Sequence, residues 1–147
     1  MTPTAIHRIV ARCRAGRDPA LVARMRSGWA VLGERQVFAG YCLLLPDPVV
    51  SHLNALAADG RRAFLEDMAT LGDALIDATG AIRVNYAMFG NAEPALHAHL
   101  FPRRDDEPQP LRALQPWALD WNAAPPYSAA LHGDLQRLIR AALARRG

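Results

Sequence analysis

The chain of 147 residues contains no lysine and only two cysteines, Cys13 and Cys42. Two cysteines so far apart exclude a disulfide-rich scaffold, and the C-x-x-C pair of many structural zinc sites is missing. No apolar run is long enough to cross a bilayer. The first 16 residues lack the apolar block and small-residue cleavage site of a secretory signal. We therefore expect a cytoplasmic protein with reduced thiols and no membrane partner.

All 17 basic residues are arginine, and the formal net charge at pH 7 is +3. These arginines are spread along the chain instead of alternating with aromatic residues in one segment. A nucleic-acid platform depends on such alternation, so we expect no nucleic-acid partner. Arginine nevertheless suits a small anionic ligand, because its planar fork matches phosphate oxygens.

The length and a hydrophobic content of 51% suit one domain with a sizeable core. We expect residues 1–147 to form a single domain, with a helical N-terminal extension at 1–28 and a C-terminal arm and helix at 105–147. Within the extension, Thr4 predicts the start of one short helix, which ends at Gly16. Asp18 and Pro19 predict the start of a second short helix that reaches Met25.

Short apolar runs predict strands at 29–32, 36–38 and 41–45, and alternation predicts another strand at 83–88. Apolar residues at helical spacing predict one long helix over 59–79 and a final helix after Ser128. Four residues of the final helix are expected to face inward: Leu131, Leu135, Leu138 and Ala142. Consecutive strands with one long helix inserted predict an antiparallel sheet covered by helices, an α+β fold.

The most informative segment runs from Asn85 to Arg103 and reads NYAMFGNAEPALHAHLFPR. It holds His97 and His99 within an otherwise apolar run. On a strand, side chains two residues apart point to the same face, with Cα atoms roughly 6.5–7 Å apart. One face of this strand is therefore expected to pack into a core, while the other presents a pair of imidazoles.

This pattern resembles the histidine triad family of nucleotide hydrolases and transferases, whose motif is H-x-H-x-H, two apolar residues and often Pro-Arg. The run Phe101-Pro102-Arg103 aligns His97 with the middle histidine and His99 with the last, whereas Ala95 stands at the first. The chain is most similar to the bacterial branch of dinucleoside-polyphosphate hydrolase-like proteins, over about residues 29–104. The resemblance implies a five-stranded antiparallel sheet with one long helix and a C-terminal helix, usually paired in a homodimer.

The same resemblance implies the roles of individual residues. His97 would attack phosphorus and form a nucleotidyl-histidine, with its other ring nitrogen held by a backbone carbonyl near residue 95. His99 would donate to phosphate oxygens. Asn85, Asn91 and Glu34 match positions that contact the phosphate, the leaving group or the ribose hydroxyls. The implied ligand is a purine nucleotide or a dinucleoside polyphosphate, and neither a cofactor nor a metal is implied.

Three residues depart from the family pattern: Ala92, Glu93 and Ala95. A carboxylate beside bound phosphate costs on the order of 1 kcal/mol unless it points to solvent or finds a partner. The alternative to an enzyme is therefore a nucleotide-binding protein with little or no catalytic activity. Two histidines on one strand face also occur as a purely structural pair.

Overall fold

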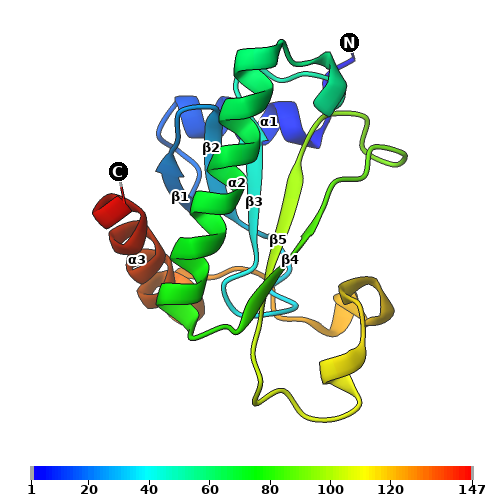
Figure 1. Cartoon of the computed structure of the whole chain (residues 1–147), viewed down its shortest axis with the longest axis vertical. Helices are drawn as coiled ribbons and strands as arrows, with labels where there is room; N and C mark the ends of the chain where they lie inside the picture. Colours follow the sequence, from blue (N-terminus) through cyan, green and yellow to red (C-terminus); the bar gives the residue numbers. More distant parts are fainter. Residues whose placement is uncertain (1, 147) are drawn as a thin grey trace.

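The computed structural model describes residues 2–146, which form a five-stranded antiparallel sheet in the order β1-β2-β3-β5-β4 (Figure 1). The strands are β1 (Leu21–Arg24), β2 (Gly28–Leu32), β3 (Cys42–Pro46), β4 (Arg83–Ala87) and β5 (Ala98–Arg103). The helices are α1 (Ala5–Arg14), α2 (Ala58–Thr79) and α3 (Ala129–Arg146). The predicted α+β class, with one long helix and a C-terminal helix, is confirmed. None of the helices in the described residues is long and apolar enough to cross a membrane.

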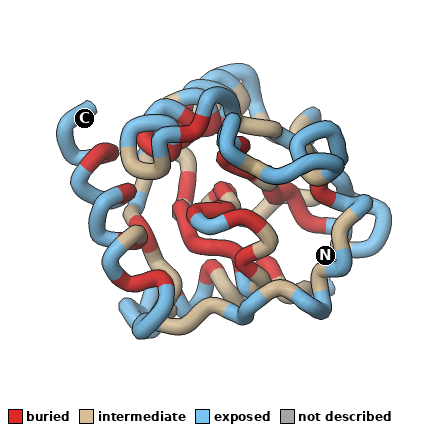
Figure 2. The backbone as a smooth tube through the Cα atoms, turned by 90° about the horizontal axis from the view of Figure 1, so that it is seen from below, coloured by how far each residue is buried: buried red, intermediate tan, exposed pale blue. Residues whose placement is uncertain are grey.

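The helices α2 and α3 cover one face of the sheet and pack against each other (Figure 1). The largest core lies beneath them, and Figure 2 shows the buried backbone gathered toward the middle of the molecule, with exposed backbone around it. Cys42, Leu44, Ala98 and Leu100 point into this core from β3 and β5. Side chains alternate along a strand, so the residues between them point to the opposite face.

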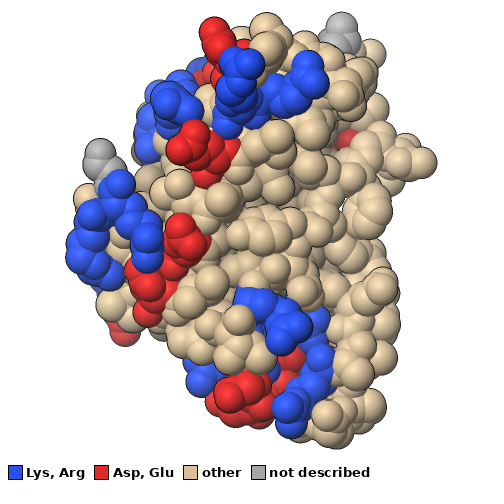
Figure 3. Space-filling view, in the orientation of Figure 1, with Lys and Arg blue, Asp and Glu red and all other residues tan. Residues whose placement is uncertain are grey.

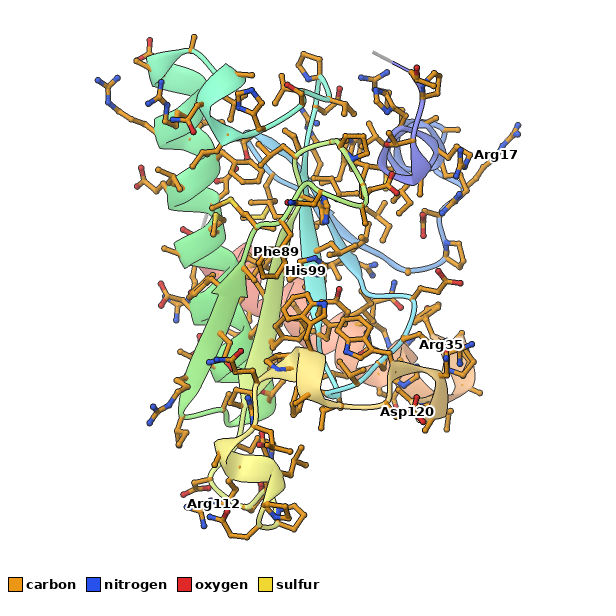
Figure 4. All side chains as sticks on the ribbon, turned by 90° about the vertical axis from the view of Figure 1, so that its right-hand side faces the viewer. Arg17, Arg35, Phe89, His99, Arg112 and Asp120 are labelled. Carbon is orange, nitrogen blue, oxygen red and sulfur yellow. The ribbon has the colours of Figure 1, made fainter. Side chains whose placement is uncertain are left out.

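That opposite face carries two smaller clusters. At one end, α1 packs its buried face against β2 and β3 through Ile6, Val10 and Cys13. At the other end lies the arm, the segment between β5 and α3, which contains short 3-10 turns and packs on Tyr41 and Phe101. Figure 4 shows His99 between α1 and the arm.

The prediction of a second short helix in the N-terminal extension is wrong, because residues 21–24 form the edge strand β1. Asp18 does organise its neighbours, but its side chain accepts from the amide of Ala20 in a turn instead of capping a helix. Apolar residues at Leu21 and Val22 fit either structure, and antiparallel pairing with β2 decides the outcome. Close pairing of β2 with β3 requires a glycine at residue 28, because a Cβ there would lie 1.8 Å from the carbonyl oxygen of Leu45.

The predicted strand at 36–38 is also wrong, because these residues form a loop between β2 and β3. The buried side chain of Gln36 replaces the strand pairing with three hydrogen bonds of its own. It donates to the carbonyl oxygens of Gly33 and Tyr41 and accepts from the amide of Gly40. The remaining predictions, strands at 29–32, 41–45 and 83–88 and a helix at 59–79, agree with the structure within one or two residues.

The inward face predicted for the final helix is only partly correct. Ala142 is buried, but Leu131 and Leu138 are 69% and 56% exposed. Gln136 and Arg140 turn toward β1 instead and donate to carbonyl oxygens of that strand. An edge strand leaves backbone carbonyls without a neighbouring strand, so polar side chains at this position of α3 satisfy them.

Candidate active site

A cavity of about 740 Å³ opens on the sheet face between α1 and the arm. His97 and His99 both line it, with their ring centroids 4.9 Å apart. Glu34 and Glu93 add carboxylates to the lining, and Ile9 of α1 adds apolar surface. The motif therefore brings its two histidines into one pocket, as predicted from the alternation of side chains on a strand.

His97 lies immediately before β5 and is 7% exposed. Its Nδ1 lies 2.7 Å from the carbonyl oxygen of Ala95, which confirms the predicted backbone contact. A carbonyl oxygen can only accept, so the neutral ring carries its proton on Nδ1 and its lone pair on Nε2. The alanine at residue 95 does not affect this contact, because the backbone provides it.

His99 lies next to His97, on the side of the cavity that faces the arm, in an aromatic environment. Its Nδ1 is 2.6 Å from the hydroxyl of Tyr41, and its ring stacks near Phe101 and meets the edge of Trp117. Desolvation by burial, followed by the neighbouring charge of His97, lowers the pKa of His99 to about 4. The ring of His99 is therefore neutral at pH 7.

Glu93 is partnered instead of standing free beside the histidines. Its Oε1 accepts from the backbone amide of Ile6, 3.3 Å away in the first turn of α1. Partial burial opposes its ionisation, but hydrogen bonds from Thr4 and from the amides of Ile6 and Ala5 outweigh that effect. The pKa of Glu93 therefore lies below its ordinary value, and the carboxylate fixes the first turn of α1 beside the cavity.

The small side chain at residue 95 has a structural consequence. Ala95 is fully buried and belongs to the cluster that contains Ile6 and Val10 of α1. A histidine side chain at this position would need space that α1 now fills, and overpacking of this kind costs roughly 1–3 kcal/mol. The alanine and the docked helix therefore depend on each other.

The other predicted site residues are divided between two places. Glu34 is exposed and lines the same cavity as the histidines. Asn85 accepts from Nη1 of Arg103 at 2.9 Å and lines a separate cavity of about 770 Å³ beside β4. Asn91 is exposed in the turn before the histidines, outside the lining of either cavity. Among residues 2–146, no three His, Cys, Asp or Glu side chains gather closely enough to hold a metal.

Arg103, the last residue of the motif, anchors the arm. Its guanidinium pairs with Glu107 at 2.8 Å and donates to the carbonyl oxygens of Leu111 and Leu114. It also lies over the ring of Phe38, 4.4 Å from the centroid. These contacts hold the arm against the sheet, which keeps Trp117 beside His99.

Tyr41 and Trp117 contact His99, but the local sequence pattern marks neither as a site residue. Tyr41 follows Gly40 at the start of an apolar strand and reads as an ordinary core residue. One signal could have identified it, since Leu43 pairs with His99 and Tyr41 shares the strand face of Leu43. Trp117 lies in an irregular segment whose position no periodic pattern predicts.

The architecture is that of histidine triad proteins of known structure. A histidine triad protein from Marinobacter aquaeolei superposes with a TM-score of 0.75, with 16% identity and 98% of each chain covered. A hypothetical histidine triad nucleotide-binding protein from Sulfolobus tokodaii gives 0.74 with 15% identity, covering 94% of this chain and 92% of its own. A histidine triad protein from Bradyrhizobium japonicum gives 0.72 with 19% identity, covering 88% and 94%.

No protein-family model and no curated protein matches the sequence. The structural likeness extends over nearly the whole chain at low sequence identity, so it defines the fold. A fold can host unrelated activities, so the activity has to be argued from the residues of the cavity.

Proposed function

We propose that this protein is a histidine triad nucleotide hydrolase or nucleotidyl transferase that acts on a P–O–P or P–N bond. The contact between His97 Nδ1 and the carbonyl oxygen of Ala95 carries the proposal. It keeps the proton on Nδ1 and leaves Nε2 free to attack phosphorus. Structures of the same fold whose names describe them as histidine triad proteins support this reaction class by analogy.

The reaction proceeds in two displacements. First, Nε2 of His97 forms a bond to phosphorus, and the P–O or P–N bond to the leaving group breaks. The leaving group departs with the electron pair of that bond and takes up a proton. Water then attacks phosphorus and loses a proton, the Nε2–P bond breaks, and a nucleoside monophosphate leaves neutral His97 behind. Another nucleophile in place of water gives transfer, and His99 donates to the phosphate oxygens in both steps.

The cavity suits a nucleoside attached to that phosphate. Ile6 and Ile9 supply apolar surface for a purine, and Glu34 supplies a carboxylate for the ribose hydroxyls. The proposed ligand is therefore a purine nucleotide or a dinucleoside polyphosphate. Asn85 and Asn91 remain predicted contacts of the phosphate or the leaving group, and both lie outside the lining of this cavity.

One observation favours a second candidate, a nucleotide-binding protein with little or no turnover. Glu93 lines the cavity together with His97 and carries a negative charge near the proposed phosphate position. Its hydrogen bonds to α1 reduce this repulsion but do not remove the charge. The two candidates differ in turnover and share nucleotide binding.

The test combines AMP titration with turnover of a diadenosine polyphosphate and an adenosine phosphoramidate. The proposed enzyme binds AMP, releases AMP from at least one substrate, and gains the mass of one nucleotidyl group after rapid quenching. His97→Ala should lose turnover and the added mass while remaining folded, because the covalent route needs Nε2. His52→Ala changes an exposed histidine and serves as the control. AMP binding without turnover supports the second candidate, and no binding contradicts both.

We also propose that the protein forms a homodimer through β4 and α2. The edge strand β1 is covered by side chains of α3, whereas β4 forms the other edge of the sheet. Around β4 and α2 lie five exposed apolar residues: Leu65, Ile76, Ile82, Tyr86 and Met88. Figure 3 shows a largely uncharged band across this side, between clusters of charged residues. An apolar edge of this kind is normally paired or protected.

Light scattering at micromolar concentrations tests the homodimer. The expected mass is twice the chain mass of 16.1 kDa. Ile82→Glu places a charge in the proposed interface and should give the mass of a single chain. Leu131→Glu places the same charge on the exposed side of α3 and should leave the dimer intact. A single-chain mass for the wild-type protein would rule out the homodimer.

A further inference from the structure

A hydrogen bond between side chains 58 residues apart joins Tyr41 to His99 in the cavity. The hydroxyl oxygen lies 2.6 Å from Nδ1, and Tyr41 is only 3% exposed. Within residues 2–146, His99 is the one hydrogen-bond partner that this hydroxyl has. A buried donor without an acceptor costs about 1–3 kcal/mol. The arrangement therefore favours Tyr41 as the donor and Nδ1 of His99 as the acceptor.

The position of the Tyr41 hydroxyl is fixed by its neighbours. A Cβ at residue 33 would lie 2.1 Å from the tyrosine ring, so Gly33 allows the ring to lie against the backbone. Gln36 donates to the carbonyl oxygen of Tyr41 at 2.9 Å, and the ring of Phe101 stacks on Tyr41 at 4.5 Å. The hydroxyl is thereby held in place before any ligand binds.

We propose that Tyr41 is a positioning residue that fixes His99 in the tautomer with a bare Nδ1 and a protonated Nε2. His99 then acts as a hydrogen-bond donor in the cavity, while His97 carries the opposite tautomer with a bare Nε2. Two histidines on one strand face are thus separated into a nucleophile and a donor. The catalytic meaning of this division rests on the proposed function, but the tautomer itself does not.

The surroundings of His99 agree with a fixed donor. Tyr41 contacts it from just before β3, Trp117 from the arm and His97 from just before β5. Of these three neighbours, Tyr41 and His97 can ionise, whereas Trp117 cannot. Burial raises the pKa of Tyr41 far above neutrality. The tyrosine therefore keeps its proton and orients His99, instead of passing a proton through it.

Nitrogen-15 spectra of the labelled full-length protein test the tautomer directly, since they distinguish a bare from a protonated ring nitrogen. His99→Gln assigns the signals. The wild-type protein should show a bare Nδ1 in His99, and Tyr41→Phe should shift the ring toward the other tautomer. His52→Gln changes an exposed histidine away from the cavity and should leave His99 unchanged. A bare Nε2 in the wild-type protein, or an unchanged tautomer in Tyr41→Phe, would overturn the proposal.

Kinetics then test the role in the proposed reaction. Tyr41→Phe should lower kcat by roughly 10- to 100-fold with little change in KM, by analogy with the hydrogen-bond partners of metal-ligating histidines. The ring and its stacking on Phe101 remain, so the fold should persist. Equal kcat values for Tyr41→Phe and the control His52→Gln would disprove the positioning role while leaving the proposed function intact. A wild-type protein without turnover would contradict the proposed enzyme, and the spectra would still decide the tautomer.

Discussion

The two ends of the candidate site hold their histidines by different means. At the α1 end, His97 is fixed by a backbone carbonyl, and the charged group beside it is Glu93, whose carboxylate accepts from the first turn of α1. At the arm end, His99 is fixed by the side chain of Tyr41 and surrounded by aromatic rings. The backbone contact tolerates sequence change nearby, whereas the aromatic end depends on several particular side chains.

This difference shows why two identical residues, two positions apart, need not behave alike. Spacing on a strand decides which face a side chain occupies. The tautomer and the pKa depend on what packs against that face, and these partners come from distant parts of the chain. Variants that disturb one end while leaving the other intact test this separation.

The largest effect is expected at the arm end, from Arg103→Ala. Arg103 pairs with the buried carboxylate of Glu107 and also donates to carbonyl oxygens of the arm. The variant therefore leaves those carbonyl oxygens without this donor and removes the ion partner of Glu107, whose carboxylate keeps the backbone amide of Arg104. Such a loss costs about 3–5 kcal/mol of unfolding free energy. Urea denaturation measures it, with Arg62→Ala, an exposed arginine of α2, as the control.

The double variant Arg103→Met with Glu107→Leu sharpens the same test. It removes both charges together, so much of the lost stability should return. A small effect of Arg103→Ala alone would show that the arm docks through its aromatic residues and does not depend on the ion pair.

Local sequence patterns predicted most of the sheet and the long helix because those segments carry a clear period. The strands around Leu44 and Leu100 are continuously apolar or alternate, and α2 ends at Gly80, which adopts a left-handed φ of 73°. The pattern at Leu21 and Val22 is too short to separate strand from helix, so pairing with β2 decided it. Which face of α3 is exposed depends on the hydrogen bonds that Gln136 and Arg140 donate to carbonyl oxygens of β1. No sequence pattern within α3 predicts these bonds.

The candidate site, like the fold, could be predicted from the sequence only where local spacing determines it. The motif indicated that His97 and His99 share one face and that a backbone carbonyl holds His97, and both are present. The Tyr41–His99 and Ile6–Glu93 contacts join residues 58 and 87 positions apart. Contacts of this kind follow from the packing of whole elements, so they cannot be read from spacing near the motif.

A smaller effect is expected from acidification, and it should arise at the arm end. The pKa of His99 is about 4 in the folded protein and near 6.5 in an unfolded chain, so the unfolded state binds more protons between these values. The contribution of His99 to stability is therefore fully present above pH 6.5 and is lost as the pH falls toward 4. Its partial exposure reduces the expected loss to about 1–2 kcal/mol.

Urea denaturation at pH 7.5 and pH 4.5 measures this loss in the wild-type protein and in His99→Gln. Protonation of carboxylates with lowered pKa values, including Asp47, also destabilises the protein as the pH falls. The difference between the two proteins therefore isolates the contribution of His99. His52→Gln, at an exposed histidine, should behave like the wild-type protein. An equal loss in His99→Gln would show that His99 can be protonated without cost in the folded state.

The smallest effect is expected at the α1 end, from Glu93→Gln. The variant keeps the shape of the side chain and an acceptor for the amide of Ile6, but removes the negative charge at the helix N-terminus. Such a charge contributes about 0.3–1 kcal/mol at low ionic strength and less in salt. The loss of unfolding free energy should therefore shrink as sodium chloride is added, while hydrogen exchange at the Ile6 amide accelerates. Glu66→Gln, an exposed carboxylate on α2, is the matched control. A loss that salt does not change would mean that Glu93 holds α1 by shape alone, and the contrast between a charged and an aromatic end would then fail.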